Sequence, residues 1–539
     1  LEVTAGRGPS GYLRVRRTTT RLVVDDCTWR PDGTLALTAT HPAHDRGQIV
    51  LRGRARRKEF AFDLVADPSS GVLRAEIPVA AVPSVAGVLP LRPGRWDVLF
   101  RPPGDRALTV RLSAPAAKNL PDPLEVARRG YALETRDGRL VVAVTGDVSP
   151  EEKSAGPKYR EEARRRVERD GLRDAVVFSC FSGRQFSDSP KAVHQELLRR
   201  GSDLEQFWVV NDAQVELPNT LKPLRLNGKE WHEALATSRY IVTNHRLGDD
   251  FRRHPDQIVL QTWHGTPLKK IGRDIKEVHF AYTPGMKKAL QAKSAGPAVP
   301  EWSHLLSPNP FSTEIFRRAF AFEGEMLEVG YPRNDLLHSP DADTVAKQVK
   351  ARLGIPEGKR VVLYAPTWRD DQYYSRGRYK FDMRLDLERA RKALGDDHVL
   401  LVRLHTNVVD GVPEDEHGFV RDVSLYPDIT ELYLISDMLI SDYSSVMFDY
   451  ANTGRPMLFF TYDLADYRDR LRGFYFDFEA EAPGPLVETS DDLIDAIRDV
   501  DAATAGHADR YKDFVARFCP LDDGHAAART VDRVFGQSD

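Results

Sequence analysis

Two histidines stand where apolar runs end, in settings suited to proton transfer or phosphate binding. His264 follows QIVLQTW and opens the stretch HGTPLKKIG, and His405 follows HVLLVRL. An imidazole with an ordinary pKa of about 6.5 can accept a proton or bind a phosphate at neutral pH. A lone histidine is more often structural, but a second one in the equivalent position favours a functional pair.

A third strand end carries the stretch LISDYSSVMFDY, in which Asp442, Ser444 and Ser445 precede a predicted helix. The first turn of a helix presents unpaired N–H groups and the positive end of the helix dipole, which attract phosphate. Ser444 and Ser445 could add hydroxyl contacts to such an anion. The competing interpretation is that Asp442 or Ser444 only caps the helix.

Further polar residues follow other predicted strands, so the motifs form a constellation rather than isolated signals. Such strand ends are where ligands bind in open α/β sheets. VFSCFSGRQFSDSP and LYAPTWRDD are two more of these loops. The additional candidates are Arg369 and Arg403 as charge-neutralising groups, with Ser182, Gly265, Thr266 and Lys269 as acceptor or cleft residues.

The elements that must position these residues fall into two rounds of alternating apolar strands and helices. This rhythm predicts an α/β protein in which two doubly wound, Rossmann-type halves face one another across a cleft. Before them, short alternating runs separated by Pro, Gly and Asp predict an antiparallel, sandwich-like β-domain. The predicted divisions are 1–115 for the β-rich domain, 116–170 for a linker, hairpin and charged helix, 171–345 for the first half and 346–539 for the second.

Composition excludes several classes of protein. A chain of 539 residues needs more than one domain, and 29% charged residues with 41% hydrophobic ones fit a globular protein. A net charge of −3 gives no global attraction to nucleic acid. No apolar run reaches the roughly 20 residues of a membrane span, and no signal peptide is evident. Three dispersed cysteines suit a reducing cytoplasm and predict no metal site. The first residue is not Met, which is consistent with a fragment of a longer protein.

Six motifs in order resemble the CDP-glycerol glycerophosphotransferase family, the teichoic acid primases and polymerases of Gram-positive cell walls. They are FSGRQFSDSP, WHGTPLK, GYPRND, YAPTWR, RLHTN and SDYSSVMFDY, and the resemblance spans roughly residues 170–520. It implies a GT-B-like fold, which agrees with the strand and helix pattern. The β-rich first part has no counterpart in the smaller members of the family.

The resemblance also implies an enzyme and a mechanism. A CDP-polyol, CDP-glycerol or CDP-ribitol, would donate polyol phosphate to a hydroxyl of a teichoic-acid-like or capsular polymer or primer, and CMP would leave. His264 would be the general base, while His405, Thr406, Ser444 and Ser445 would hold the pyrophosphate. Asp442 matches a motif aspartate important for activity. We expect no cofactor, because positioning and charge stabilisation carry phosphoryl transfer.

The resemblance implies a lipid-linked or polymeric acceptor and a peripheral location at the cytoplasmic face of the membrane. The arginine-rich stretch 160–173 is a candidate contact with anionic lipid, although a solvated helix is the simpler interpretation. Two other functions stay open. One is a GT-B glycosyltransferase that uses a nucleotide sugar, and the other is a non-catalytic polymer-binding protein.

Overall fold

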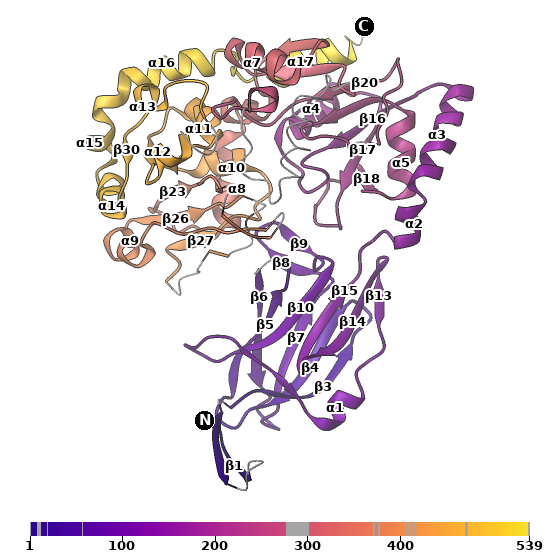
Figure 1. Cartoon of the computed structure of the whole chain (residues 1–539), viewed down its shortest axis with the longest axis vertical. Coiled ribbons are helices and arrows are strands. Elements are labelled where there is room, and N and C mark those ends of the chain that lie inside the picture. Colours follow the sequence, from indigo (N-terminus) through magenta and orange to yellow (C-terminus); the bar gives the residue numbers. More distant parts are fainter. Residues whose placement is uncertain are drawn as a thin grey trace. The chain divides into compact units, whose positions relative to one another are not determined.

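The chain divides into two compact units, each described by itself (Figure 1). Unit 1 comprises Leu1–Ser149 with Asp212–Gln214, and unit 2 comprises Pro150–Asn211 with Val215–Asp539. The computed structural model describes residues 2–7, 12–18, 20–55, 58–248, 250–275, 301–369, 372–375, 378–405, 408, 411–412, 417–468 and 473–536. Among these residues, no helix has the length and apolarity needed to cross a bilayer. All three cysteines are buried and free.

Unit 1 is a mostly antiparallel sheet with the strand order β12-β3-β4-β7-β6-β5-β10-β15-β14-β13, and β11 also pairs with β10. Trp29 on β3 and Tyr131 on β14 lie near opposite ends of this order, yet their ring centres are 6.3 Å apart. The sheet therefore curls around one shared apolar core. Its strands are β3 (Val23–Trp29), β4 (Thr34–Thr40), β5 (Arg46–Gly53), β6 (Glu59–Ala66), β7 (Leu73–Pro78), β10 (Gly94–Arg101), β11 (Leu108–Thr109), β12 (Arg111–Leu112), β13 (Leu124–Val126), β14 (Arg129–Arg136) and β15 (Arg139–Val144).

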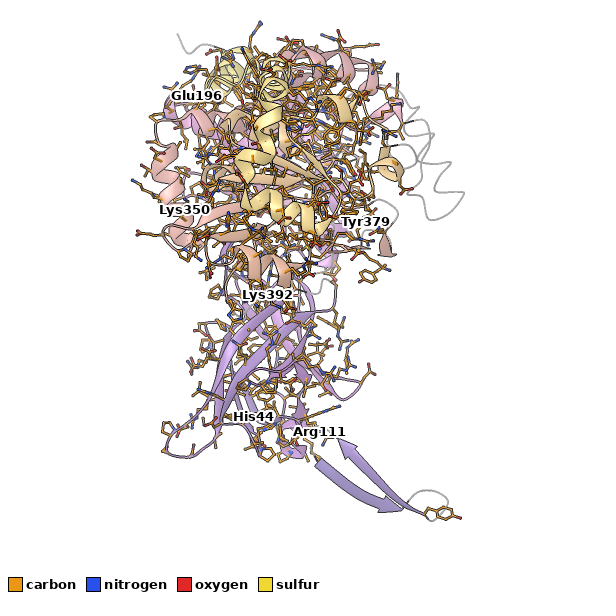
Figure 2. All side chains as sticks on the ribbon, turned by 90° about the vertical axis from the view of Figure 1, so that its left-hand side faces the viewer. His44, Arg111, Glu196, Lys350, Tyr379 and Lys392 are labelled. Atoms are coloured by element: carbon orange, nitrogen blue, oxygen red, sulfur yellow. The ribbon has the colours of Figure 1, made fainter. Side chains whose placement is uncertain are left out.

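The hairpin predicted as part of a linker after residue 115 instead completes this sheet. β15 pairs with β10 in the register Gly94↔Val144 to Asp97↔Val141, and β14 pairs with β15. Val142 and Val144 belong to the shared core, so burial of these alternating side chains extends the unit to Ser149. Two separate hairpins, β1–β2 (Glu2–Arg7, Leu13–Thr18; Figure 2) and β8–β9 (Val82–Ser84, Gly87–Leu89), and the short helix α1 (Ala114–Lys118) complete unit 1.

The first half of unit 2 is an all-parallel sheet in the order β18-β17-β16-β19-β20-β21-β22. Numbered along the chain this order is 3-2-1-4-5-6-7, so the strand order reverses beside β16, where Rossmann-type sheets bind ligands. The strands are β16 (Arg173–Ser179), β17 (Glu205–Val210), β18 (Lys222–Arg225), β19 (Ser238–Thr243), β20 (Ile258–Gln261), β21 (His304–Ser307) and β22 (Glu325–Glu328). The helices are α2 (Pro150–Ser154), α3 (Gly156–Asp170), α4 (Asp188–Arg199), α5 (Lys229–Thr237) and α7 (Pro310–Phe320), with the 3-10 helices η1 (Gly272–Asp274) and η2 (Pro332–His338).

The second half repeats the design with the order β27-β26-β23-β28-β29-β30, which is 3-2-1-4-5-6 along the chain. Its strands are β23 (Arg360–Tyr364), β26 (His398–Val402), β27 (Val420–Asp422), β28 (Met438–Ser441), β29 (Met457–Phe460) and β30 (Leu486–Val487), and a short hairpin pairs β24 (Tyr373–Ser375) with β25 (Arg378–Tyr379). The helices are α8 (Ala342–Arg352), α9 (Leu387–Leu394), α10 (Ile429–Ile435), α11 (Val446–Tyr450), α12 (Leu464–Asp466), α13 (Phe478–Glu481), α14 (Ser490–Arg498), α15 (Val500–Thr504), α16 (Ala508–Phe518) and α17 (Ala526–Phe535), with the 3-10 helices η3 (Ala451–Thr453) and η5 (Ala505–His507).

The chain returns to the first half at its end, which alters the predicted division at residue 346. α17 packs beside α4, and Val531 and Val534 join the core around β16 and β17 (Figure 1). Asp335 also accepts bonds from the N–H groups of Ala526 and Ala527, at 3.0 and 2.8 Å. The apolar stripe of α17 is buried against the first sheet, so residues 346–539 are not one continuous half.

Candidate active site

His264 lies just past the end of β20, in a loop that fixes its tautomer. The preceding Trp263 adopts a left-handed φ of +54°, a conformation that non-glycine residues rarely take. The Nδ1 atom of His264 lies 2.9 Å from the carbonyl oxygen of Asn244. Because a carbonyl oxygen only accepts, Nδ1 must donate its proton, and Nε2 keeps the lone pair that a base needs.

The surroundings keep His264 neutral. Its ring stacks on Trp263 at 4.6 Å and meets the edge of Phe181 at 5.8 Å. Burial lowers the pKa of His264 below its ordinary value, while the bond to the Asn244 carbonyl and the charge of Asp188 oppose that shift. A neutral imidazole at pH 7 is the protonation state that proton abstraction requires.

Gly265, the next residue, marks the place where the two halves of unit 2 meet. Its N–H donates to the Tyr331 hydroxyl at 3.1 Å. A Cβ atom built on Gly265 would lie 2.6 Å from the Ser445 hydroxyl oxygen, so only glycine allows this approach. The structure thus brings the His264 loop and the Ser444–Ser445 loop before α11 into contact, although they are far apart in sequence. Thr266 follows and is buried.

His405 belongs to the same electrostatic environment. Its ring centre lies 5.6 Å from that of Trp368. The protein around His405 lowers its pKa to about 4, first by desolvation and then through the charges of Lys269 and His264. Lys269 places its ammonium 5.8 Å from the Tyr467 ring centre. The charges of Lys269 and His264, in the first half, thus act on His405, in the second half.

Asp442 and Arg369 form a buried pair whose polar atoms are used within the protein. Oδ1 of Asp442 accepts from the N–H groups of Thr367 and Tyr443, at 2.8 and 2.6 Å, and Oδ2 accepts from Arg369 at 2.8 Å. The remaining Arg369 donors bond to Asp463, to the Thr367 carbonyl and to a tyrosine hydroxyl. All five N–H groups of Arg369 are therefore engaged, and none is left for a phosphate.

The other predicted residues have different settings. Arg403 donates to the Tyr426 carbonyl at 2.6 Å, and burial lowers its pKa. The Ser182 hydroxyl lies 3.3 Å from Nδ1 of His245, whose ring is 6.4 Å from that of His264. Thr406 lies outside the described residues. Within the described part of the chain, no group of three or more His, Cys, Asp or Glu side chains is arranged to hold a metal ion.

A buried polar network behind His264 includes residues that sequence reasoning left without a role. The Asn244 side chain donates to Asp188 at 3.0 Å, and Asp188 pairs with Arg333 at 3.0 Å. Arg333 also binds both oxygens of Asp449, at 2.9 and 3.0 Å, and Asp449 belongs to the second half. Asp188 has a φ of +62°, a strained conformation that the network holds in place. The motifs FSDSP and GYPRND contained Asp188 and Arg333, but no local pattern indicates that they pair.

The chain is similar to known proteins. A family model described as CDP-Glycerol:Poly(glycerophosphate) glycerophosphotransferase matches residues 163–536. The chain belongs to this family. The match leaves most of the β-rich unit outside it.

Individual relatives agree with this assignment. The teichoic acid poly(glycerol phosphate) polymerase of Bacillus subtilis is 39% identical over 82% of the chain, and the chain spans 58% of that protein's length. The teichoic acid glycerol-phosphate transferase of Staphylococcus aureus is 42% identical over 67% of the chain and 93% of its own length. A solved structure of the wall teichoic acid polymerase TagF has a TM-score of 0.64 at 34% identity, covering 71% of this chain and 93% of that one.

Family membership confirms the resemblance derived from the six motifs. The fold prediction is confirmed at the level of two Rossmann-like parallel sheets in a mixed α/β protein. The roles of the individual site residues stay predictions, and the geometry above limits which roles each one can fill.

Proposed function

We propose that this chain transfers glycerol phosphate from CDP-glycerol to a hydroxyl group of a teichoic-acid-like polymer or primer, and releases CMP. The observation that carries the proposal is the pairing of a neutral His264, with Nε2 unprotonated, and the Ser444–Ser445 loop across the contact at Gly265. Family membership supplies the reaction class.

In the proposed reaction, Nε2 of His264 accepts the proton of the acceptor hydroxyl. The acceptor oxygen forms a bond to the glycerol-bearing phosphorus, and the bond from that phosphorus to the CMP oxygen breaks. His405, Ser444 and Ser445 bind the pyrophosphate, with Thr406 as a further predicted contact. The two Rossmann-type halves act as a GT-B arrangement, with acceptor and base on the first half and donor on the second.

The buried pair suits positioning better than substrate contact. Asp442 ties the loop after β23 to the loop after β28 through the N–H groups of Thr367 and Tyr443. Arg369, whose N–H groups are all bonded within the protein, neutralises the charge of Asp442. We therefore assign both residues to holding the donor loop. Arg403 stays a candidate charge-neutralising group on the donor side, and Lys269, Ser182 and Thr266 stay acceptor or cleft candidates.

Glycerol is favoured over ribitol by the pattern of identities. Four relatives named for glycerol phosphate are 37–42% identical to the chain, whereas four named for ribitol phosphate are 28–34% identical. CDP-ribitol is the second candidate donor.

The proposal also includes the place and the acceptor: the chain acts at the cytoplasmic surface of the membrane, on a lipid-linked acceptor.

A donor screen tests the proposal. The protein is incubated with a glycerol-phosphate-primed acceptor and with CDP-glycerol, CDP-ribitol or a panel of UDP-sugars, and nucleotide release is measured. We expect acceptor-dependent CMP release, fastest with CDP-glycerol. Release of UDP alone would establish a glycosyltransferase instead, and no release with any donor would favour a non-catalytic polymer binder.

A further inference from the structure

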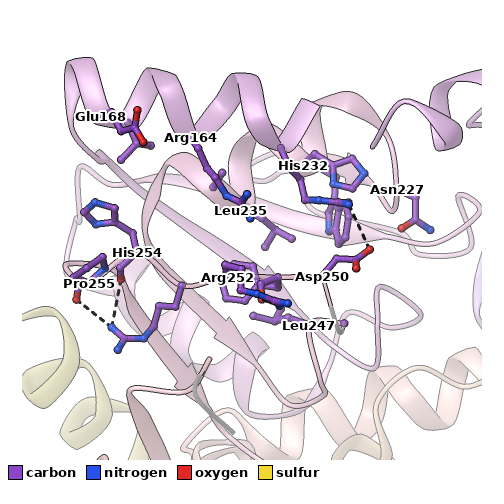
Figure 3. Close-up of a pocket in the computed structure, with 17 residues that line it drawn as sticks. Arg164, Glu168, Asn227, His232, Leu235, Leu247, Asp250, Arg252, His254 and Pro255 are labelled. Carbon is purple, nitrogen blue, oxygen red and sulfur yellow. Dashed lines mark hydrogen bonds and ion pairs between the residues drawn. The ribbon is translucent and has the colours of Figure 1, made fainter. Parts of the chain in front are cut away.

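A cavity of about 350 Å³ opens on the first half of unit 2 (Figure 3). Its walls are α3, α5 and the segment that follows β19, which contributes residues 247–248 and 250–255. None of its lining residues belongs to the site proposed for phosphoryl transfer. The cavity therefore needs its own explanation.

The floor of this cavity is apolar. Trp231 and Leu235 come from α5, and Leu247 and Phe251 come from the segment after β19. Trp231, Leu247 and Phe251 pack against the core on that side of the sheet but are only partly buried. A hydrocarbon chain laid over them would remove this apolar surface from water.

The rim carries an excess of positive charge. Arg160 and Arg164 stand one turn apart on α3. Arg252 and Arg253 line the cavity from the loop, where Arg253 donates to carbonyl oxygens of the same loop. The acidic groups lining the cavity are Glu168 and Asp250, against these four arginines.

Only part of this positive charge is compensated. Asp250 pairs with Arg160 at 3.4 Å, but its side chain is 79% exposed. Arg164 has no hydrogen bond or ion pair with any described residue, and Figure 3 shows it extending from α3 towards Leu235. Arg164 is exposed, and an arginine beside an apolar floor without a protein partner is available to an anionic ligand.

His232 adds a polar group to the wall. It is only 5% exposed. Burial first, and the charge of Arg160 second, lower the pKa of His232 to about 4. The imidazole is thus neutral at pH 7 and offers a hydrogen bond without charge.

We propose that this cavity binds an anionic amphiphile, with a phosphate or carboxylate group at Arg164 and an apolar chain over Trp231, Leu247 and Phe251. The arginine rim alone would take any small anion, and the apolar floor alone would take any hydrocarbon. Their combination within one cavity selects a molecule that carries both. This inference is independent of the proposed transfer reaction.

Octyl phosphate, a soluble probe, tests the proposal by calorimetry on the full chain. The variant is Arg164→Gln, and the matched control is Arg165→Gln. Arg165 lies on the same helix but outside the cavity, where it pairs with Glu161 at 3.1 Å and is 73% exposed. We expect Arg164→Gln to weaken binding about tenfold or more, as loss of a charged hydrogen bond predicts, and Arg165→Gln to leave it unchanged.

Two further probes separate the parts of the ligand. Inorganic phosphate and octanol should each bind at least about tenfold more weakly than octyl phosphate, because each contacts only half of the site. Equal affinity for inorganic phosphate, or equal binding by Arg164→Gln and the wild type, would overturn the proposal. Thermal unfolding checks that both variants are folded.

Vesicles then identify the source of the ligand. Sedimentation with phosphatidylglycerol vesicles that is weakened by Arg164→Gln assigns the anion to a bilayer lipid. Sedimentation that does not depend on Arg164, together with Arg164-dependent binding of octyl phosphate, assigns it to a free amphiphile.

Discussion

Replacing Arg333 with methionine would break the ion-pair network that joins the two halves of unit 2. The Arg333 side chain is 4% exposed, and its partners Asp188 and Asp449 are each 7% exposed. Its guanidinium group lies 3.0 Å from Asp188 and 2.9 Å from Asp449. Methionine keeps much of the packing volume but leaves two buried carboxylates without their cation.

The cost follows from burial. Removing one partner of a buried pair destabilises a protein by about 3–5 kcal/mol, because the remaining charge is left in a medium of low polarity. Burial already raises the pKa of Asp449 to about 6 even with Arg333 present. Without Arg333 the pKa of Asp449 rises further, so the folded state binds a proton more tightly than the unfolded state does. The stability of Arg333→Met should therefore fall as pH rises through this pKa, and its deficit should be larger at pH 8 than at pH 5.

Urea unfolding followed by tryptophan fluorescence measures this deficit at both pH values. The matched control is Arg239→Met, which breaks a pair of equal length with Asp174, at 3.0 Å, whose side chains are 45% and 77% exposed. Exposed pairs contribute about 0–1 kcal/mol, so the control should hardly shift the transition. Equal losses in the two variants, or a deficit for Arg333→Met that does not grow with pH, would refute the argument from burial.

The remaining predictions concern the site. His264→Ala should lower kcat by about 10²- to 10⁴-fold, as loss of a general base does, with CDP-glycerol affinity retained in equilibrium binding; a large loss of affinity would assign His264 to donor binding. His405→Ala should weaken CDP-glycerol binding as well as turnover, and unchanged affinity would contradict its role. In a plot against pH, kcat/KM should fall on the acidic side with the pKa of His264, which is below 6.5. Asp188→Asn should move this fall to lower pH, because the Asp188 charge raises the pKa of His264. Gly265→Ala should cost about 1–3 kcal/mol in kcat/KM through overpacking, and in the double variant with Ser445→Gly that cost should vanish relative to Ser445→Gly alone; additive losses would show that the two residues do not meet.

Strand and helix periodicity was sufficient to predict both Rossmann-type sheets, because their buried strands are continuous apolar runs such as VVLY and HVLLV. The chain's return through α17 could not be predicted in the same way. The amphipathic pattern of that helix says that one face is buried, but not against which sheet. The linker hairpin was misassigned for a related reason, since the pairing of β15 with β10 is long-range.

The site was predictable to the extent that chemistry-bearing residues follow strands. His264 and His405 could be found because each ends an apolar run. The buried polar network behind His264 could not be found in this way, because Asn244, Asp188 and Arg333 act through contacts between segments far apart in sequence. For Arg369, sequence showed a cation beside the site but not the acceptors that use all of its N–H groups.

The two halves share a structural detail that supports a positioning role for Asp442, whose carboxylate oxygens accept hydrogen bonds from protein groups. In the first half, the N–H of Phe181, after β16, donates to the side chain of Asn244, after β19, at 2.7 Å. In the second half, the N–H of Thr367, after β23, donates to the side chain of Asp442, after β28, at 2.8 Å. Both bonds lie where the strand order reverses, and each fixes one strand-end loop to another. The first-half residue is neutral and also presents its carbonyl to His264, whereas Asp442 is charged and is balanced by Arg369. The same kind of bond thus supports the tautomer of His264, the proposed base, on one side and holds the proposed donor loop on the other.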